Sequence, residues 1–156
     1  MKSPLITCCV IVLLVSCKND KNDNAYPITS PSNSNVRTLE GTWELVSFYN
    51  YIDNEVTDSF KTREGYRQVK MYTATKVMWS KHVPSDATEW FGYGSYTIED
   101  KHLKEILDYG SVMMSKIIQE RTEFIYELDL QKNKFSQIEI DEEGNRIYSE
   151  NYRRIE

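Results

Sequence analysis

The segment HLKEILDYG, residues 102–110, places one carboxylate among apolar side chains and is the first candidate for chemistry. Because side chains alternate between the two faces of a strand, Glu105 shares its face with Leu103, Leu107 and Tyr109. If this face points inward, Glu105 is placed to act as a general base or to anchor a ligand. Two other interpretations stay open. Either Glu105 faces solvent, or it is buried in an ion pair with an arginine.

Aromatic residues are abundant in the body of the chain and supply candidate walls for a pocket. Trp79, Trp90, Tyr93 and Tyr96 lie in neighbouring segments, and such rings combine a rigid apolar surface with a polar tip. Most of them are expected to be core residues or cross-strand pairs. The residues predicted to line a ligand site are Trp79, Tyr96, Glu105, Tyr109, Tyr126 and Glu150.

Several kinds of site are not favoured by the residue pattern. His82 and His102 are the only histidines, and they are not at metal-ligand spacing. No glycine-rich phosphate loop and no Ser-His-Asp order are visible, so we expect neither a metal nor another cofactor. The net charge is −5 and no basic patch occurs, which argues against nucleic acid as a partner.

Strand-like runs separated by turn signals make up most of the chain after residue 35. They predict eight strands at residues 42–50, 65–72, 75–82, 90–98, 102–109, 123–130, 134–140 and 146–155. The segment 112–120 has helical spacing and is either a short helix or a loop, and the polar stretch 51–64 is predicted to be an irregular loop. Eight sequential antiparallel strands predict an all-β, up-and-down barrel, because closure removes exposed strand edges.

Period-two alternation predicts which side chains point into this barrel. On the first strand these are Trp43, Leu45 and Ser47. On the sixth strand they are Phe124, Tyr126, Leu128 and Leu130. On the last strand they are Tyr148, Glu150, Tyr152 and Arg154. Gly92 and Gly94 flank Tyr93 and indicate a bulge or bend in the barrel wall.

The segment LEGTWEL, residues 39–45, resembles the Gly-x-Trp opening of lipocalin-type barrels. The resemblance implies that Trp43 closes one end of the barrel against an arginine of the last strand. Arg154 is the matching residue, and a cation–π contact is the physical reason for the pairing. Residues 70–80 and 93–111 are similar to lipocalin-like domains of unknown function in Gram-negative lipoproteins, and the similarity covers most of residues 39–156.

This chain departs from true lipocalins in one respect. Lipocalins commonly carry disulfides, whereas the three cysteines here, Cys8, Cys9 and Cys17, all precede the predicted barrel. The long-chain ligands of true lipocalins are therefore a poor guide to the ligand of this protein.

The first residues predict an export signal. Lys2 is followed by an apolar run over residues 5–15 that is too short to span a bilayer. The sequence Leu14-Val15-Ser16-Cys17 resembles the lipobox of bacterial lipoproteins, in which the cysteine receives lipid after cleavage. The alternative is an ordinary signal peptide that happens to contain a cysteine. The resemblance implies a signal peptide over 1–16 and lipidation of Cys17.

A polar tract separates this signal from the barrel. Residues 17–35 are rich in Asn, Ser and Pro and predict a flexible tether, and residues 36–156 form the barrel domain. In the lipoprotein family an Asp after the lipidated cysteine retains the protein at the inner membrane, so Lys18 favours the outer membrane. The leaflet stays open between the periplasmic face and the cell surface.

Three functions follow from these observations, in order of preference. The first is a lipid-anchored envelope lipoprotein whose barrel binds a small apolar or amphipathic molecule. The second is a scaffold with a side-chain-filled barrel that contacts another envelope protein. The third is a small enzyme that uses Glu105 or Glu150 as acid or base, although no set of residues forms a catalytic constellation.

Overall fold

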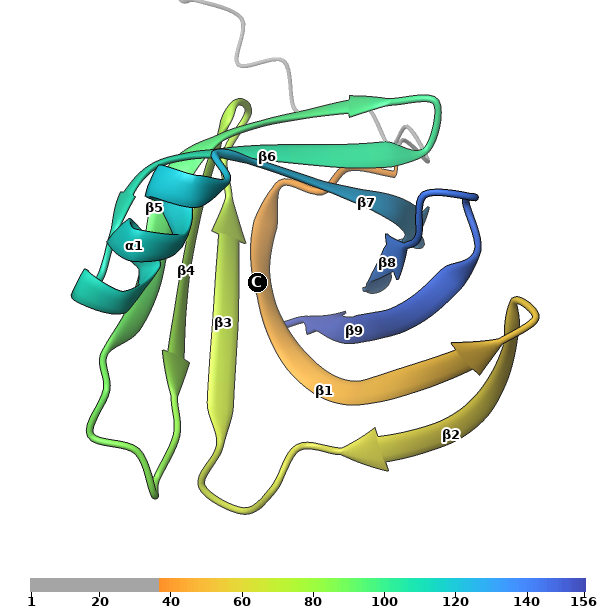
Figure 1. The fold of residues 1–156 in the computed structure, drawn as a ribbon, viewed down its shortest axis with the longest axis horizontal. Helices are drawn as coiled ribbons and strands as arrows, with labels where there is room; N and C mark the ends of the chain where they lie inside the picture. Colours follow the sequence, from red (N-terminus) through yellow and green to blue (C-terminus); the bar gives the residue numbers. More distant parts are fainter. Residues whose placement is uncertain (1–36) are drawn as a thin grey trace, which may run out of the picture. The chain divides into compact units, whose positions relative to one another are not determined.

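The computed structural model describes residues 37–156 (Figure 1). The predicted signal peptide over 1–16, the tether over 17–35 and the lipidation site Cys17 lie outside the described residues. The described part is one antiparallel sheet with one helix. Its elements are β1 (Gly41–Ile52), β2 (Glu55–Lys61), β3 (Arg67–Tyr72), β4 (Lys76–His82), β5 (Trp90–Glu99), β6 (His102–Gly110), α1 (Val112–Glu120), β7 (Glu123–Leu130), β8 (Lys134–Ile140) and β9 (Arg146–Arg154).

The sheet closes on itself through β1. The strand order is β2-β1-β3-β4-β5-β6-β7-β8-β9, and β9 pairs again with β1. The first residues of β1 pair with β3, while its later residues pair with β2 on that side and with β9 on the other. Figure 1 shows β1 as the long curved strand that connects these neighbours. Eight strands therefore form the ring, and β2 extends it as a flap.

The all-β barrel predicted from the sequence is confirmed, and each of the eight predicted runs corresponds to a strand. The segment 112–120 is a helix rather than a loop. The side-chain oxygen of Ser111 caps it by accepting from the backbone N–H of Met114 at 3.3 Å. Met114 is the buried residue of this helix and packs against Gly110 of β6.

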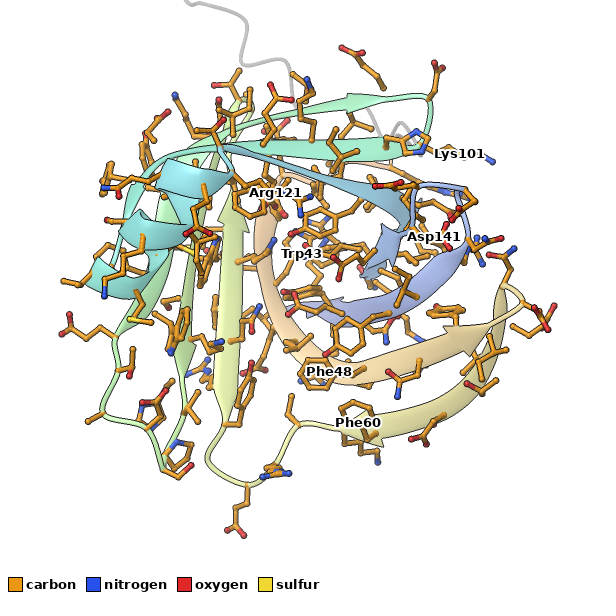
Figure 2. All side chains as sticks on the ribbon, viewed as in Figure 1. Trp43, Phe48, Phe60, Lys101, Arg121 and Asp141 are labelled. Atoms are coloured by element: carbon orange, nitrogen blue, oxygen red, sulfur yellow. The ribbon has the colours of Figure 1, made fainter. Side chains whose placement is uncertain are left out.

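The prediction of an irregular loop over 51–64 was wrong, because β2 occupies its centre. Every side chain of β2 is exposed, so the segment carries none of the alternation that reveals a strand. The strand is held by backbone pairing to β1 and by the stacking of Phe60 on Phe48, whose ring centroids are 5.2 Å apart (Figure 2). Asp53 and Asn54 make the turn between the two strands with positive φ.

One predicted inward residue of β1 points outward. Trp43 and Leu45 are buried as expected, but the register of β1 with β9 shifts between Leu45 and Ser47. The extra residue between them forms a β-bulge, and beyond it the side chains that would have pointed inward point outward. In the part of β1 that follows the bulge, Phe48 rather than Ser47 therefore packs against the core.

The apolar half of the barrel interior consists of Leu39, Trp43, Val77, Leu103 and Phe135, all less than 2% exposed. The rings of Trp43 and Phe135 meet edge to face with centroids 4.9 Å apart. The Trp43 indole N–H donates to the Leu39 carbonyl at 2.7 Å, so its polar atom is satisfied despite burial.

Arg154 covers one end of this apolar half. Its guanidinium carbon is 4.0 Å from the Trp43 ring centroid, and its N–H groups donate to the carbonyls of Thr38, Glu40 and Lys132. Gly41 makes this approach possible, because its φ is +130° and a side chain there would collide with the guanidinium. A glycine two residues before Trp43 thus leaves the space in which the Arg154 guanidinium lies over the Trp43 ring.

Candidate functional site

The second half of the barrel interior is polar and contains a buried ion pair. The Lys70 ammonium lies 2.8 Å and 3.1 Å from the two carboxylate oxygens of Glu105, and both side chains are at most 3% exposed. Lys70 also donates to the Gln137 side-chain carbonyl at 2.6 Å. The Tyr72 hydroxyl donates to Glu105 at 2.5 Å. Each charge is therefore matched by an opposite charge and by further hydrogen bonds, as burial requires.

Glu150 is the second interior carboxylate, and its donors are all neutral. The Tyr152 hydroxyl donates to Oε2 at 2.6 Å, and the side-chain amides of Gln68 and Gln137 donate to the same oxygen at 3.2 Å and 3.3 Å. Gln137 thereby joins the two carboxylates, since its oxygen accepts from Lys70 while its nitrogen donates to Glu150. We call Gln68, Lys70, Glu105, Gln137 and Glu150 the polar half of the interior.

Strand β3 supplies much of this polar half because its polar side chains point inward. In RQVKMY the buried residues are Gln68, Lys70 and Tyr72, whereas Met71 is 44% exposed. The strand thus presents its more polar face to the interior. That arrangement is stable only because every member of the network has a partner, and no buried side-chain nitrogen or oxygen in residues 37–156 lacks one.

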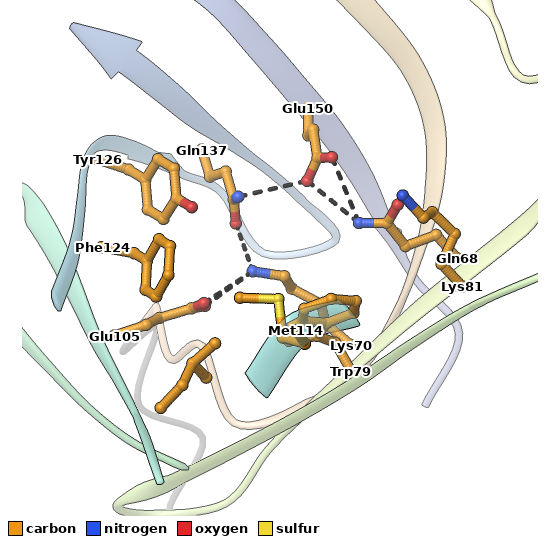
Figure 3. Close-up of a pocket in the computed structure, with 11 residues that line it drawn as sticks. Gln68, Lys70, Trp79, Lys81, Glu105, Met114, Phe124, Tyr126, Gln137 and Glu150 are labelled. Carbon is orange, nitrogen blue, oxygen red and sulfur yellow. Dashed lines mark hydrogen bonds and ion pairs between the residues drawn. The ribbon is translucent and has the colours of Figure 1, made fainter. Parts of the chain in front are cut away.

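A cavity of about 140 Å³ opens beside the polar half (Figure 3). Apart from the five residues of the polar half, its wall consists of Trp79, Lys81, Leu107, Met114, Phe124 and Tyr126. Phe124 and Tyr126 come from β7, and Met114 comes from α1. The cavity therefore combines an aromatic and aliphatic wall with a carboxylate network, which is the composition expected of a small-molecule site.

Two polar groups on the cavity wall have no hydrogen-bond partner within the part of the chain that the structure describes. They are the Tyr126 hydroxyl and the Trp79 indole N–H, and both atoms are accessible to solvent, because no fully buried side-chain nitrogen or oxygen of residues 37–156 lacks a partner. Groups of this kind gain from a hydrogen bond to water or to a bound molecule. They are the atoms available to orient a ligand.

The tyrosines around the cavity stay protonated at neutral pH. Burial, followed by the negative charges of Glu105 and Glu150, raises the pKa of Tyr126 far above its usual value. The same causes raise the pKa of Tyr72, and burial with Glu150 first among the charges raises that of Tyr152. Burial and Glu150 raise the pKa of Tyr66 to about 12. These hydroxyls can therefore donate hydrogen bonds at neutral pH. The raised pKa values also show that the negative charges of Glu105 and Glu150 act on the tyrosines of the interior.

Four of the six residues predicted to line a site surround this cavity, namely Trp79, Glu105, Tyr126 and Glu150. Tyr96 does not, because its ring packs edge to face on Tyr72 and its hydroxyl donates to the Thr73 carbonyl at 2.8 Å.

Tyr109 lies outside the barrel and is 56% exposed. The register of β5 with β6 shifts between Tyr93 and Gly94, and this bulge breaks the alternation that would place Tyr109 beside Glu105. The glycines flanking Tyr93 do mark a bulge, as the sequence indicated. Gly94 also admits the β6 backbone so closely that any side chain there would collide with it.

Glu105 faces the interior and is buried in an ion pair, so the interpretation that it faces solvent was wrong; its partner is a lysine rather than the expected arginine. The sequence interpretation also missed Gln68 and Gln137. One signal for Gln68 was present in the sequence. Gln68, Lys70 and Tyr72 alternate with Arg67, Val69 and Met71, so the first three share one face of the strand, but the alternation alone does not say which face points inward.

Over residues 37–156, no three His, Cys, Asp or Glu side chains come together in a group that could hold a metal ion. Within the same range, no helix is both long and apolar enough to cross a membrane.

Comparisons with known proteins add a structural neighbour. No protein-family model matches the chain. No curated protein matches it either. A crystal structure of an uncharacterized protein from Bacteroides eggerthii DSM 20697 is similar, with a TM-score of 0.48 and 15% sequence identity. The similarity covers 75% of this chain and 99% of that one.

Proposed function

We propose that this protein is a lipid-anchored envelope lipoprotein whose barrel binds a small, partly apolar ligand. The observation that carries the proposal is the cavity beside the polar half, with its aromatic wall and with the donors of Trp79 and Tyr126, which no other group of residues 37–156 engages. A barrel that served only as a scaffold would gain stability by filling this space with apolar side chains.

The cavity limits the size of the ligand. Its volume of about 140 Å³ is close to that of an engineered protein cavity of roughly 150 Å³ that binds benzene. The ligand, or the part of it that enters the barrel, is therefore the size of a single ring. This supports a small molecule rather than a long acyl chain.

The same geometry does not favour the enzyme hypothesis. The Glu105 carboxylate is held in an ion pair with Lys70 and also accepts from the Tyr72 hydroxyl, so its charge is already matched by the protein rather than kept available for a substrate. Glu150 accepts from two glutamine amides and a tyrosine hydroxyl, and within residues 37–156 neither carboxylate is hydrogen-bonded to a serine, cysteine or histidine that could act with it as a catalytic pair.

Two sequence features support the envelope location. The lipobox-like Leu14-Val15-Ser16-Cys17 supports lipidation, and Lys18 supports delivery to the outer membrane. The contact of Trp43 with Arg154 supports the lipocalin-like interpretation of the barrel. Metabolic labelling with an alkyne fatty acid tests the anchor. We expect label on the full chain and none on Cys17→Ser, and equal labelling of both proteins would contradict it.

Saturation-transfer NMR with single-ring probes tests ligand binding. The probes are phenol and benzyl alcohol, added to the full chain in detergent. We expect transfer to both probes and its loss in Met114→Trp, which fills the cavity. Met113→Trp is the matched control, because Met113 is the neighbouring helix residue and is 39% exposed. Absence of transfer, or equal transfer in both variants, would contradict the proposal.

A further inference from the structure

The polar half contains two carboxylates, Glu105 and Glu150, but one buried ammonium, Lys70. We infer that the cavity selects a small cation, a primary ammonium on a single-ring or short aliphatic body, whose charge pairs with Glu150. This inference rests on the proposed function, since it names the chemistry of the ligand for the same cavity.

Lys70 shows how this interior accommodates a primary ammonium. Its nitrogen contacts the Glu105 carboxylate and the Gln137 side-chain oxygen, and it lies 5.9 Å from the ring centroids of Tyr72, Tyr126 and Tyr152. The elements of the site are therefore a carboxylate, an amide oxygen and aromatic rings.

Glu150 has a similar environment without the cation. Two glutamine amides and the Tyr152 hydroxyl contact it, while no Lys, Arg or His nitrogen of residues 37–156 forms an ion pair with it. Its Oε2 accepts three hydrogen bonds, whereas its Oε1 accepts only one from Gln68, at the long distance of 3.4 Å. Oε1 is thus the oxygen with capacity for a charged donor.

Lys81 also belongs to the cavity wall, but its charge is engaged elsewhere. Its ammonium lies 4.3 Å from the ring centroid of Trp90, whose indole N–H donates to Asp86 at 3.2 Å. Hydrogen bonds from Thr88 and Trp90 lower the pKa of Asp86, and the nearby charge of Lys81 lowers it further. Glu150 is therefore the carboxylate of the polar half that has no cationic partner.

The rest of the wall suits the body of such a ligand. Trp79, Phe124 and Tyr126 present aromatic surface, and Leu107 and Met114 present aliphatic surface. Aromatic faces attract a cation as well as an apolar ring, and they do so most strongly where water is excluded. A neutral ring would gain the apolar contacts alone, and an anion would be repelled by Glu150.

Isothermal titration of the full chain in detergent at pH 7 with benzylamine, benzyl alcohol and benzoate tests the inference. The three probes share one ring and differ in charge. We expect benzylamine to bind at least about tenfold more tightly than benzyl alcohol, since a hydrogen bond to a charged group contributes that much, and benzoate to bind most weakly. The preference for the amine should disappear in Glu150→Gln and persist in Glu143→Gln, whose carboxylate is exposed.

The outcomes separate the two proposals. If benzyl alcohol binds as tightly as benzylamine, or if the preference survives in Glu150→Gln, the cation inference is wrong and the binding function stands. If none of the three probes binds, both are wrong. Should Glu150→Gln fail to fold, the order of the three probes on the unaltered chain still decides between a cation-selective cavity and a neutral one.

Discussion

The two halves of the barrel interior share strands β6 and β8 but differ in how their side chains fill the space. In the apolar half, Trp43, Phe135 and their neighbours fill the space, and the Arg154 guanidinium covers the Trp43 ring. In the polar half, Lys70 and Glu105 form an ion pair, Gln137 links this pair to Glu150 by hydrogen bonds, and a cavity opens beside them. Close packing contributes most of the stability of a small domain, whereas polar networks of this kind contribute specificity and a site. The difference suggests that stability and binding are separated along the barrel.

The largest expected difference between the halves concerns their tryptophans. Trp43→Ala should lower the free energy of unfolding by about 3–5 kcal/mol, because Trp43 is fully buried in close packing. Trp79→Ala should cost less than roughly half of that, since Trp79 is partly exposed and already borders a cavity. Urea denaturation measures both values. Equal losses would contradict the division into a packed half and an open half.

The second prediction compares the two carboxylates. Lys70→Met should lower the free energy of unfolding by about 3 kcal/mol, because it leaves the buried Glu105 without its cation. Glu150→Gln should change it by less than about 1 kcal/mol, because Glu150 has no cation to lose and glutamine keeps one acceptor oxygen.

Two further variants complete this comparison. The double change Lys70→Met with Glu105→Leu should recover much of the lost stability, since it removes both charges together. Lys104→Met is the matched surface control. Its ion pair with Glu123 is 39% and 49% exposed, so the loss should stay below about 1 kcal/mol. A double variant no more stable than Lys70→Met alone would argue against the ion-pair account.

The third prediction concerns the covering of the apolar half. Arg154→Lys should lower the free energy of unfolding by about 1–2 kcal/mol, because a lysine cannot donate to three carbonyls and stack on Trp43 at once. Arg153→Lys is the control, since Arg153 is 61% exposed and holds a surface ion pair. Thermal unfolding of both variants is the measurement. An unchanged midpoint in Arg154→Lys would contradict the claim that Arg154 stabilises the apolar half by covering Trp43.

The smallest expected effect lies outside the interior. Hydrogen bonds from Arg146 lower the pKa of Glu127 below its usual value of 4.5. A lowered pKa means that the folded state favours the ionised form, so the stabilisation is present above pH 4.5 and is lost as the pH falls further. Because this pair is 36% and 28% exposed, it should contribute less than about 1 kcal/mol.

Urea denaturation from pH 7 to pH 3 checks this effect. The difference between the unaltered chain and Glu127→Gln should be largest at pH 7 and shrink below pH 4.5. A difference that stays constant over that range would show that Glu127 does not contribute through its charge.

The barrel could be predicted from the sequence because most strands alternate clearly and are separated by short turns. The flap strand β2 could not, since EVTDSFK exposes all of its side chains and is held by its backbone. Ser47 and Tyr109 were misplaced for a shared reason. Each follows a bulge, and one extra residue exchanges the faces of a strand without a change in composition.

The candidate site was only partly predictable. Glu105, Tyr126 and Glu150 could be assigned inward because apolar neighbours share their faces. Lys70 could not, since a lysine is almost never buried unless it is paired, and its carboxylate partner lies 35 residues away in the sequence. A network satisfied by residues from β3, β6, β8 and β9 is a property of the closed barrel rather than of any one segment.

The most direct test of the central claim is a methyl NMR titration of the full chain, labelled at methionine and leucine, with benzylamine. We expect the methyl signals of Met114 and Leu107 to change their chemical shifts with the added probe, while the chemical shifts of Leu39 and Leu45 stay unchanged. That result would show that a small molecule enters the polar half and not the packed half. Unchanged Met114 and Leu107 signals, or equal shifts in both halves, would contradict the claim.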